Sequence, residues 1–183
     1  MPRNVEIKAR IAGVEALTPL AASLADTGPV VLDQDDTFFA CPNGRLKLRE
    51  QAGVAAELIF YRRADEAGPK ESFYVRTPVP DPDAMRTLLQ EACGQTGRVR
   101  KRRILYRVGR TRIHLDAVAG LGEFLELEVV LQEGEPAADG VREAGRIMTA
   151  LGIEPQQLLQ GAYVDQLECT GPMSPAGPSA IAR

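Results

Sequence analysis

The sequence predicts an α+β fold in which antiparallel strands supply most of the structure. At least seven segments alternate polar and apolar residues with period two, which is typical of half-buried strands. Most of these segments are joined by short turns, and short connections favour antiparallel pairing. About four further segments carry helical patterns. The 183 residues, of which 44% are apolar, are enough for one domain with a buried core.

The first elements begin near the N-terminus. In residues 4–11 (NVEIKARI) every second residue is polar, which predicts a strand. Residues 13–25 predict a helix that Pro19 interrupts. Residues 33–39 predict a second strand.

A hairpin follows these elements. Residues 45–49 place basic side chains on one face and leucines on the other, and residues 57–63 predict the returning strand after a turn at Gly53. Residues 64–71 predict a loop, and residues 71–77 predict another strand.

The second half of the chain has the clearest helix signals. In residues 79–97, Asp81 is suited to the N-cap, Pro82 to the first turn, and Gly94 marks the end of a helix. The remaining elements are strands at residues 98–108, 111–118 and 123–132, a helix at 136–153, and a short helix that ends the segment 154–167. We expect residues 1–168 to form one domain and residues 169–183, which are rich in Pro, Gly, Ser and Ala, to form a disordered tail.

Several of these strands carry charge on a single face, because side chains alternate along a strand. The basic sets are Lys8 with Arg10; Arg45, Lys47 and Arg49; Lys101 with Arg103; and Arg112, which is followed on the same face by His114 and Asp116. The acidic set is Glu126 with Glu128, joined by Glu6 on the first strand. For any single strand, a solvated sheet face is the simple interpretation. However, rows of like charge cost stability unless an anion or a carboxylate neutralises them, and a sheet curled into a barrel would gather these faces around one interior.

These residue types together predict a site for a polyphosphate and a metal. Arg binds phosphate oxygens in a bidentate manner, and Lys acts as a point charge. Carboxylates among cations suit a hard divalent cation, Mg²⁺ or Mn²⁺. The residues therefore indicate a metal-dependent enzyme, or a binding protein, for a triphosphate. His114, the only histidine, is expected to line the barrel and not to act as a general base.

The composition limits the classes of partner and the cellular compartment that we expect. The net charge of −3 gives the whole protein no general affinity for nucleic acid, although its 22 Lys and Arg can gather locally. Three widely spaced cysteines form neither a CxxC motif nor a zinc spacing, so we expect reduced thiols in the cytoplasm. We expect no signal peptide and no membrane span, because the N-terminus lacks an apolar run and no run of about 18 apolar residues occurs.

The same segments, in the same order, resemble the CYTH superfamily, also called the triphosphate tunnel metalloenzymes, over most of residues 4–167. NVEIK is similar to the family's Glu-x-Glu-x-Lys motif, except that Asn4 stands in place of the first Glu. The other register, which begins at Glu6, would replace the second Glu instead and is not preferred. GRLKLRE resembles the basic strand of the family, Tyr61-Arg62 falls where a Tyr-Lys pair often stands, and KRR supplies a Lys-x-Arg pair. The stretch 111–128 is similar to the segment that ends in the metal-binding Glu-x-Glu.

The resemblance implies a specific fold and a set of site residues. The fold is an eight-stranded antiparallel β-barrel that forms a polar tunnel, with helices packed on the outside. The implied triphosphate-binding residues are Lys8, Arg45, Lys47, Arg49, Arg62, Lys101, Arg103 and Arg112. The implied catalytic residues are Lys8, Arg103 and Asp116, and the implied ligands of Mg²⁺ or Mn²⁺ are Glu6, Glu126, Glu128 and Asp116. The alternative for Asp116 is a salt bridge with Arg112, and the neutral Asn4 removes one charge from the metal site.

The resemblance also implies an activity. It favours a class IV adenylate cyclase-like lyase that converts ATP to cyclic AMP and pyrophosphate. The alternatives are a hydrolase of inorganic triphosphate or thiamine triphosphate, and a non-catalytic protein that binds a polyphosphate or nucleotide. We expect a small-molecule triphosphate as the partner, with no membrane and no nucleic acid, and the sequence is compatible with a homodimer.

Overall fold

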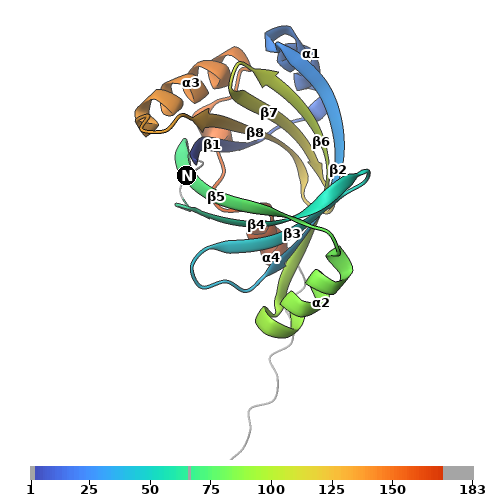
Figure 1. Ribbon diagram of the computed structural model, residues 1–183. Helices are drawn as coiled ribbons and strands as arrows, with labels where there is room; N and C mark the ends of the chain where they lie inside the picture. The colour runs from blue at the N-terminus through green and yellow to red at the C-terminus, as the bar shows by residue number, and fades with distance from the viewer. Residues whose placement is uncertain (1–2, 66, 171–183) are drawn as a thin grey trace, which may run out of the picture.

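The structure is a computed structural model that describes residues 3–65 and 67–170. Eight strands surround a central space, and the helices lie outside this ring or at one end of it (Figure 1). The strands are β1 (Arg3–Arg10), β2 (Thr27–Phe39), β3 (Arg45–Gln51), β4 (Val54–Arg63), β5 (Lys70–Val79), β6 (Gln95–Val108), β7 (Thr111–Val118) and β8 (Gly122–Leu131). The helices are α1 (Val14–Leu24), α2 (Pro82–Cys93), α3 (Ala137–Ala150), the short 3₁₀ helix η1 (Pro155–Gln157) and α4 (Tyr163–Thr170).

The strands close into a barrel in the order β1-β5-β4-β3-β2-β6-β7-β8. Every neighbouring pair is antiparallel, including the pair β1 and β8 that closes the ring. The predicted eight-stranded antiparallel barrel with external helices is therefore confirmed.

The apolar core lies between the outer face of the barrel and the helices. On β1, Val5, Ile7 and Ala9 are fully buried and point outward, and helix α3 packs over β1 and β8. Helix α1 packs against β6, β7 and β8, while α2 covers β2 and β3 on the other side (Figure 1). Burying a side chain such as Ile7 contributes roughly 1.5–3 kcal/mol. The apolar half of each alternating strand thus fixes the outward face, and the charged half is left to fill the interior.

The ends of several elements differ from the sequence expectations. Helix α1 runs through Pro19 without interruption. Pro19 is the sixth of the eleven residues of α1 and removes one backbone hydrogen bond, and the buried side chains of Leu17 and Ala21 hold α1 on the barrel despite this loss. Strand β2 starts at Thr27 and not near residue 33, because its first residues pair with the end of β6 although most of their side chains are exposed.

Helix α2 ends as predicted. The Asp81 side chain accepts a hydrogen bond of 3.0 Å from the backbone N–H of Ala84, and Gly94 adopts a positive φ of 79° at the C-terminus. Helix α4 extends to Thr170, so the first two residues of the predicted tail are helical, and the rest of that tail lies outside the described residues. Among the described helices, none combines the length and the apolar character that a membrane span requires.

Candidate active site

The barrel encloses a cavity of about 490 Å³ that side chains from all eight strands line. Its size falls in the range of small-molecule sites. Among the described residues, nine Lys and Arg side chains line it: Lys8, Lys47, Arg49, Arg63, Arg76, Lys101, Arg103, Arg107 and Arg112. Five carboxylates line it as well: Glu6, Asp36, Glu57, Glu126 and Glu128. The excess of positive charge in an enclosed space favours a multiply charged anion as the ligand.

The strand register arranges the charges on β1, β8 and β7 in rows. Each row crosses three neighbouring strands, because residues that are paired in an antiparallel sheet lie side by side. The rows are Lys8, Glu126 and His114, and then Glu6, Glu128 and Arg112. Glu126 and Glu128 therefore each have a basic side chain beside them.

The basic residues of β3 are held by a carboxylate from β2. Lys47 Nζ donates to Asp36 Oδ2 at 2.8 Å, and Arg49 donates from Nε and Nη2 to the two oxygens of Asp36 at 2.7 Å each. Burial raises the pKa of Asp36, but Arg49 and Lys47 outweigh this effect and hold the pKa well below its ordinary value. Asp36 is not among the site residues expected from the sequence. Its position two residues after Gln34 and two before Phe38, all on one face of β2, is the signal that could have found it.

The basic residues of β6 are held from β7. Arg103 donates from Nε and Nη2 to the two oxygens of Asp116 at 2.7 and 2.6 Å, and Lys101 Nζ lies 3.6 Å from Asp116 Oδ2. Tyr163 on α4 donates its hydroxyl proton to the same carboxylate at 3.1 Å. Asp116 is completely buried behind the cavity wall and so orients these side chains. The alternative of an Asp116–Arg112 salt bridge is wrong, because Arg112 pairs with Glu128 across the sheet at 2.7 Å.

Two lysines of this wall have strongly lowered pKa values. Burial, reinforced by the nearby Arg103, lowers the pKa of Lys101 to about 7. Burial and the adjacent Arg49 lower the pKa of Lys47 to about 8. The ligand-free cavity thus gathers more positive charge than its carboxylates neutralise, and an anion bound here would raise both pKa values.

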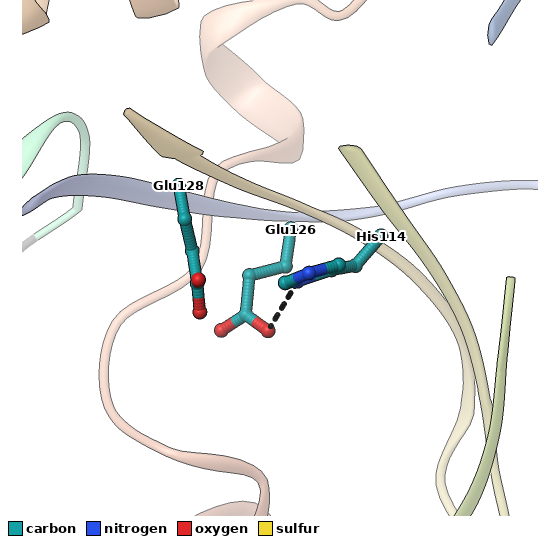
Figure 2. Close-up of side chains that lie close together, drawn as sticks. All are labelled: His114, Glu126 and Glu128. Atoms are coloured by element: carbon teal, nitrogen blue, oxygen red, sulfur yellow. Dashed lines mark ion pairs between the residues drawn. The ribbon is translucent and has the colours of Figure 1, made fainter. Parts of the chain in front are cut away.

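A cluster of possible metal donors lies on β7 and β8, next to β6 in the barrel. One donor atom each from His114, Glu126 and Glu128 lies within 4.8 Å of the others, and Figure 2 shows the three side chains on the same side of the sheet. Burial raises the pKa of Glu126, but Lys8 and Arg103 outweigh it and hold this pKa well below its ordinary value. Burial lowers the pKa of His114, so its imidazole is neutral near pH 7. Two carboxylates and a neutral imidazole fit a divalent cation.

Two predicted metal ligands are not part of this donor cluster. Glu6 lies beside Glu128 on the paired strand, but its carboxylate is paired with Arg63 on β4. Asp116 is enclosed by Arg103 and Tyr163. In this structure the donors that converge are therefore those of β7 and β8. Asn4 lines the cavity two residues before Glu6, and its buried Oδ1 has no hydrogen-bond partner within the described part of the chain.

Two predicted phosphate-binding residues lie outside the cavity. Arg62 points away from the interior and packs over the ring of Phe73 at 5.2 Å, whereas its neighbour Arg63 lines the cavity. Strict alternation from Tyr61, which also lines the cavity, would have selected Arg63. Arg45 lies beyond the cavity at the end of the barrel, where it pairs with Asp65 and with Asp165 of α4. The other predicted phosphate-binding residues are Lys8, Lys47, Arg49, Lys101, Arg103 and Arg112, and all of them line the cavity.

Helix α4 and the segment before it close one end of the barrel. The backbone N–H of Leu159 donates to the carbonyl of Lys8 at 2.8 Å, and Arg63 donates to the carbonyl of Gly161 at 2.7 Å. The ring of Tyr163 then lies under the Lys8 ammonium, 3.8 Å from Nζ to the ring centroid. Toward the other end of the barrel the lining side chains are exposed and several are apolar: Val54, Ala55, Arg76, Pro78 and Arg107. The deepest part of the cavity is charged, and the outer part is more apolar.

Comparisons with known proteins agree with this geometry. The profile of the CYTH domain family matches residues 2–163. The adenylate cyclase CyaB of Aeromonas hydrophila is 25% identical over 170 residues, which cover 87% of this chain and 86% of that protein.

Solved structures share the fold. The PH1012 protein of Pyrococcus horikoshii OT3 superposes with a TM-score of 0.80 at 21% identity, covering 88% of this chain and 98% of that one. HpAC1 from Hippeastrum, an adenylyl cyclase candidate with a dominant triphosphatase activity, superposes with a TM-score of 0.65 at 16% identity, covering 94% and 98%. At these identities the structural likeness establishes the fold alone.

Proposed function

Because the chain belongs to the CYTH family, we propose that it is a metal-dependent enzyme that acts on a triphosphate, with conversion of ATP to cyclic AMP and pyrophosphate as the favoured reaction. One observation carries the proposal: nine basic side chains and a compact donor cluster face one enclosed cavity. The similarity to an adenylate cyclase over most of both chains supports the choice of reaction.

The basic wall is the proposed phosphate site. Lys47 and Arg49 on β3 and Lys101 and Arg103 on β6 line the same cavity, and each pair is fixed by its own buried carboxylate. Because these side chains are oriented before the ligand arrives, little free energy is spent on ordering them when it binds. Arg49 and Arg103 offer guanidinium donors to phosphate oxygens, and the lysines add positive charge. In this proposal Asp116 positions Arg103, and its lowered pKa, which Arg103 and Lys101 hold down against the effect of burial, makes it a poor proton acceptor.

The proposed cation site is the donor cluster of β7 and β8. Glu126 and Glu128 would hold Mg²⁺ or Mn²⁺, which when bound supplies positive charge to phosphate oxygens. Lys8 lies 3.1 Å from Glu126 and lines the cavity beside it, so it can contact a phosphate and the acidic wall at once.

In the cyclase reaction, the 3′-hydroxyl oxygen of ATP forms a bond to the α-phosphorus while the bond from this phosphorus to the bridging oxygen breaks. Pyrophosphate leaves and the hydroxyl proton passes to solvent. The negative charge that develops on the leaving pyrophosphate would be stabilised by Arg103, Lys101 and Lys8. The exposed and partly apolar outer part of the cavity, which includes Val54 and Pro78, offers a place for the nucleoside.

Hydrolysis of inorganic or thiamine triphosphate is the second candidate. The position of the charges favours this reaction. The deepest and most buried part of the cavity is basic, so it can bind a triphosphate without contacting an organic group. Here water would attack the terminal phosphorus and orthophosphate would be released.

The products distinguish the candidates. Purified protein is incubated with Mg²⁺ or Mn²⁺ and either ATP or inorganic triphosphate, and the products are separated by chromatography. Cyclic AMP with an equal amount of pyrophosphate supports the cyclase, and orthophosphate from either substrate supports the hydrolase. Tight binding of both substrates without any product would contradict the enzymatic proposal and identify a binding protein.

A further inference from the structure

Within the described part of the chain, His114 has a buried nitrogen that makes no hydrogen bond. The residue lies on β7 directly opposite Glu126 of β8, and it is 4% exposed. Its Nδ1 lies 3.5 Å from Glu126 Oε2, and among the described residues it has no hydrogen-bond partner. A buried polar atom without a hydrogen-bond partner is destabilising, so such an atom points to a ligand that would satisfy it.

The neighbours of this nitrogen are metal donors. Donor atoms of Glu126 and Glu128 lie within 4.8 Å of the imidazole donor, and the three side chains converge from two adjacent strands (Figure 2). This spacing allows one ion to contact all three groups. Cations also face this region: Lys8 and Arg103, which contact Glu126, and Arg112, which pairs with Glu128. These cations bind carboxylate oxygens and not the imidazole. Among the described residues, the imidazole nitrogen keeps only its 3.5 Å approach to Glu126.

We propose that His114 is a nitrogen ligand of the divalent cation held by Glu126 and Glu128, and that it makes the site prefer Mn²⁺ and related transition metals to Mg²⁺. The inference deepens the proposed function and rests on it, since it names the metal class of the same site.

The chemistry of the two kinds of cation supports this preference. Mg²⁺ is a hard ion that binds oxygen and keeps several waters. Imidazole nitrogen suits first-row transition metals, whose affinity for a given nitrogen and oxygen site rises from Mn²⁺ through Co²⁺. A site of two carboxylates alone would serve Mg²⁺ and Mn²⁺ similarly, whereas an added imidazole favours the transition metals.

The single histidine makes the test unambiguous. Tag-free full-length protein is loaded with Mn²⁺ alone, and electron spin echo envelope modulation is recorded on protein labelled at histidine with ¹⁴N or with ¹⁵N. We expect nitrogen modulation that changes with the isotope, because the one imidazole is bound to the metal. A spectrum without histidine nitrogen coupling, at saturating Mn²⁺, would overturn the proposal.

Metal affinities give a second test. In His114→Gln we expect the affinity for Mn²⁺ to fall at least about tenfold, because loss of groups that merely orient a ligand already costs that much. We expect the affinity for Mg²⁺ to change less than about threefold, since Mg²⁺ gains little from imidazole. The matched control is Ser72→Ala, a buried cavity-lining residue on β5 outside the donor cluster, which should leave both affinities unchanged. Equal losses for Mn²⁺ and Mg²⁺ in folded His114→Gln would contradict the proposal.

The experiments distinguish failure of this inference from failure of the proposed function. These measurements contain no triphosphate and no turnover, so histidine coupling in a protein that forms no product would support the metal site and contradict the enzyme. Product formation with Mn²⁺ and no histidine coupling would contradict the metal site alone.

Discussion

Replacement of Lys101 by methionine should stabilise the ligand-free protein while it removes triphosphate binding. Lys101 is buried in the cavity wall, and its pKa falls from an ordinary 10.5 to about 7 through burial and the nearby Arg103. One pKa unit corresponds to about 1.4 kcal/mol, so the folded state loses on the order of 4 kcal/mol near pH 7 in accommodating this group. Methionine keeps the aliphatic packing and lacks the charge.

The size of the effect depends on pH. The unfolded chain binds the Lys101 proton below about pH 10.5, whereas the folded chain binds it only below about pH 7. The wild-type protein therefore loses stability as pH falls from 10.5 to 7, and the variant lacks this loss. At pH 7 we expect the free energy of unfolding of Lys101→Met to exceed that of the wild type by about 2–4 kcal/mol, an increase in Tm of roughly 5–15 °C. The difference should shrink toward pH 10.

Denaturation monitored by circular dichroism at pH 7 and pH 9.5 measures this difference. The control is Arg102→Met, which removes a charge from the exposed face of the same strand, 3.9 Å from Asp33. Such a surface change should shift stability by less than about 1 kcal/mol. Added tripolyphosphate should stabilise the wild type and Arg102→Met, but not Lys101→Met. A ligand-free Lys101→Met protein less stable than the wild type at pH 7, or a difference that grows with pH, would refute the reasoning.

Three further predictions concern the cavity. Arg63→Ala should weaken tripolyphosphate binding at least about tenfold, whereas Arg62→Ala, one residue away and outside the barrel, should leave it unchanged; isothermal titration calorimetry measures both, and equal losses would contradict the assignment. Glu126→Gln should reduce turnover at least about a hundredfold while the fold is kept, because it removes a cation ligand; near wild-type turnover would exclude that role. Tripolyphosphate binding should weaken as pH rises from 6.5 to 9, because Lys101 and Lys47, with pKa values near 7 and 8, lose their protons; calorimetry in buffers of different ionisation enthalpy should show proton uptake on binding, and its absence would contradict these pKa values.

The sequence was sufficient for the barrel and for most of its charged lining. Period-two alternation at residues 45–49 and 101–103 assigns Lys47, Arg49, Lys101 and Arg103 to one face, because the apolar residues between them must meet the helices. The sheet closes because β1 pairs with β8, and the residue pattern of a single strand does not reveal this pairing. The closed ring came from the family resemblance and not from periodicity.

The missed residues depend on contacts between distant segments. Asp36 is one acidic residue in a run of polar residues, and only the register of β2 against β3 shows that it holds Arg49. Tyr163 reaches Asp116 because α4 folds back over the end of the barrel, a placement that no local pattern encodes. The resemblance to a Tyr-Lys pair favours Arg62, whereas strand alternation from Tyr61 favours Arg63, the residue that lines the cavity.

A crystal structure of the protein with tripolyphosphate and Mn²⁺ would test the central claim most directly. The account predicts phosphate oxygens inside the barrel, within hydrogen-bonding distance of Arg49 and Arg103, and a cation on Glu126 and Glu128. Tripolyphosphate bound only to the outer surface, with the barrel interior free of it at saturating concentration, would contradict the account.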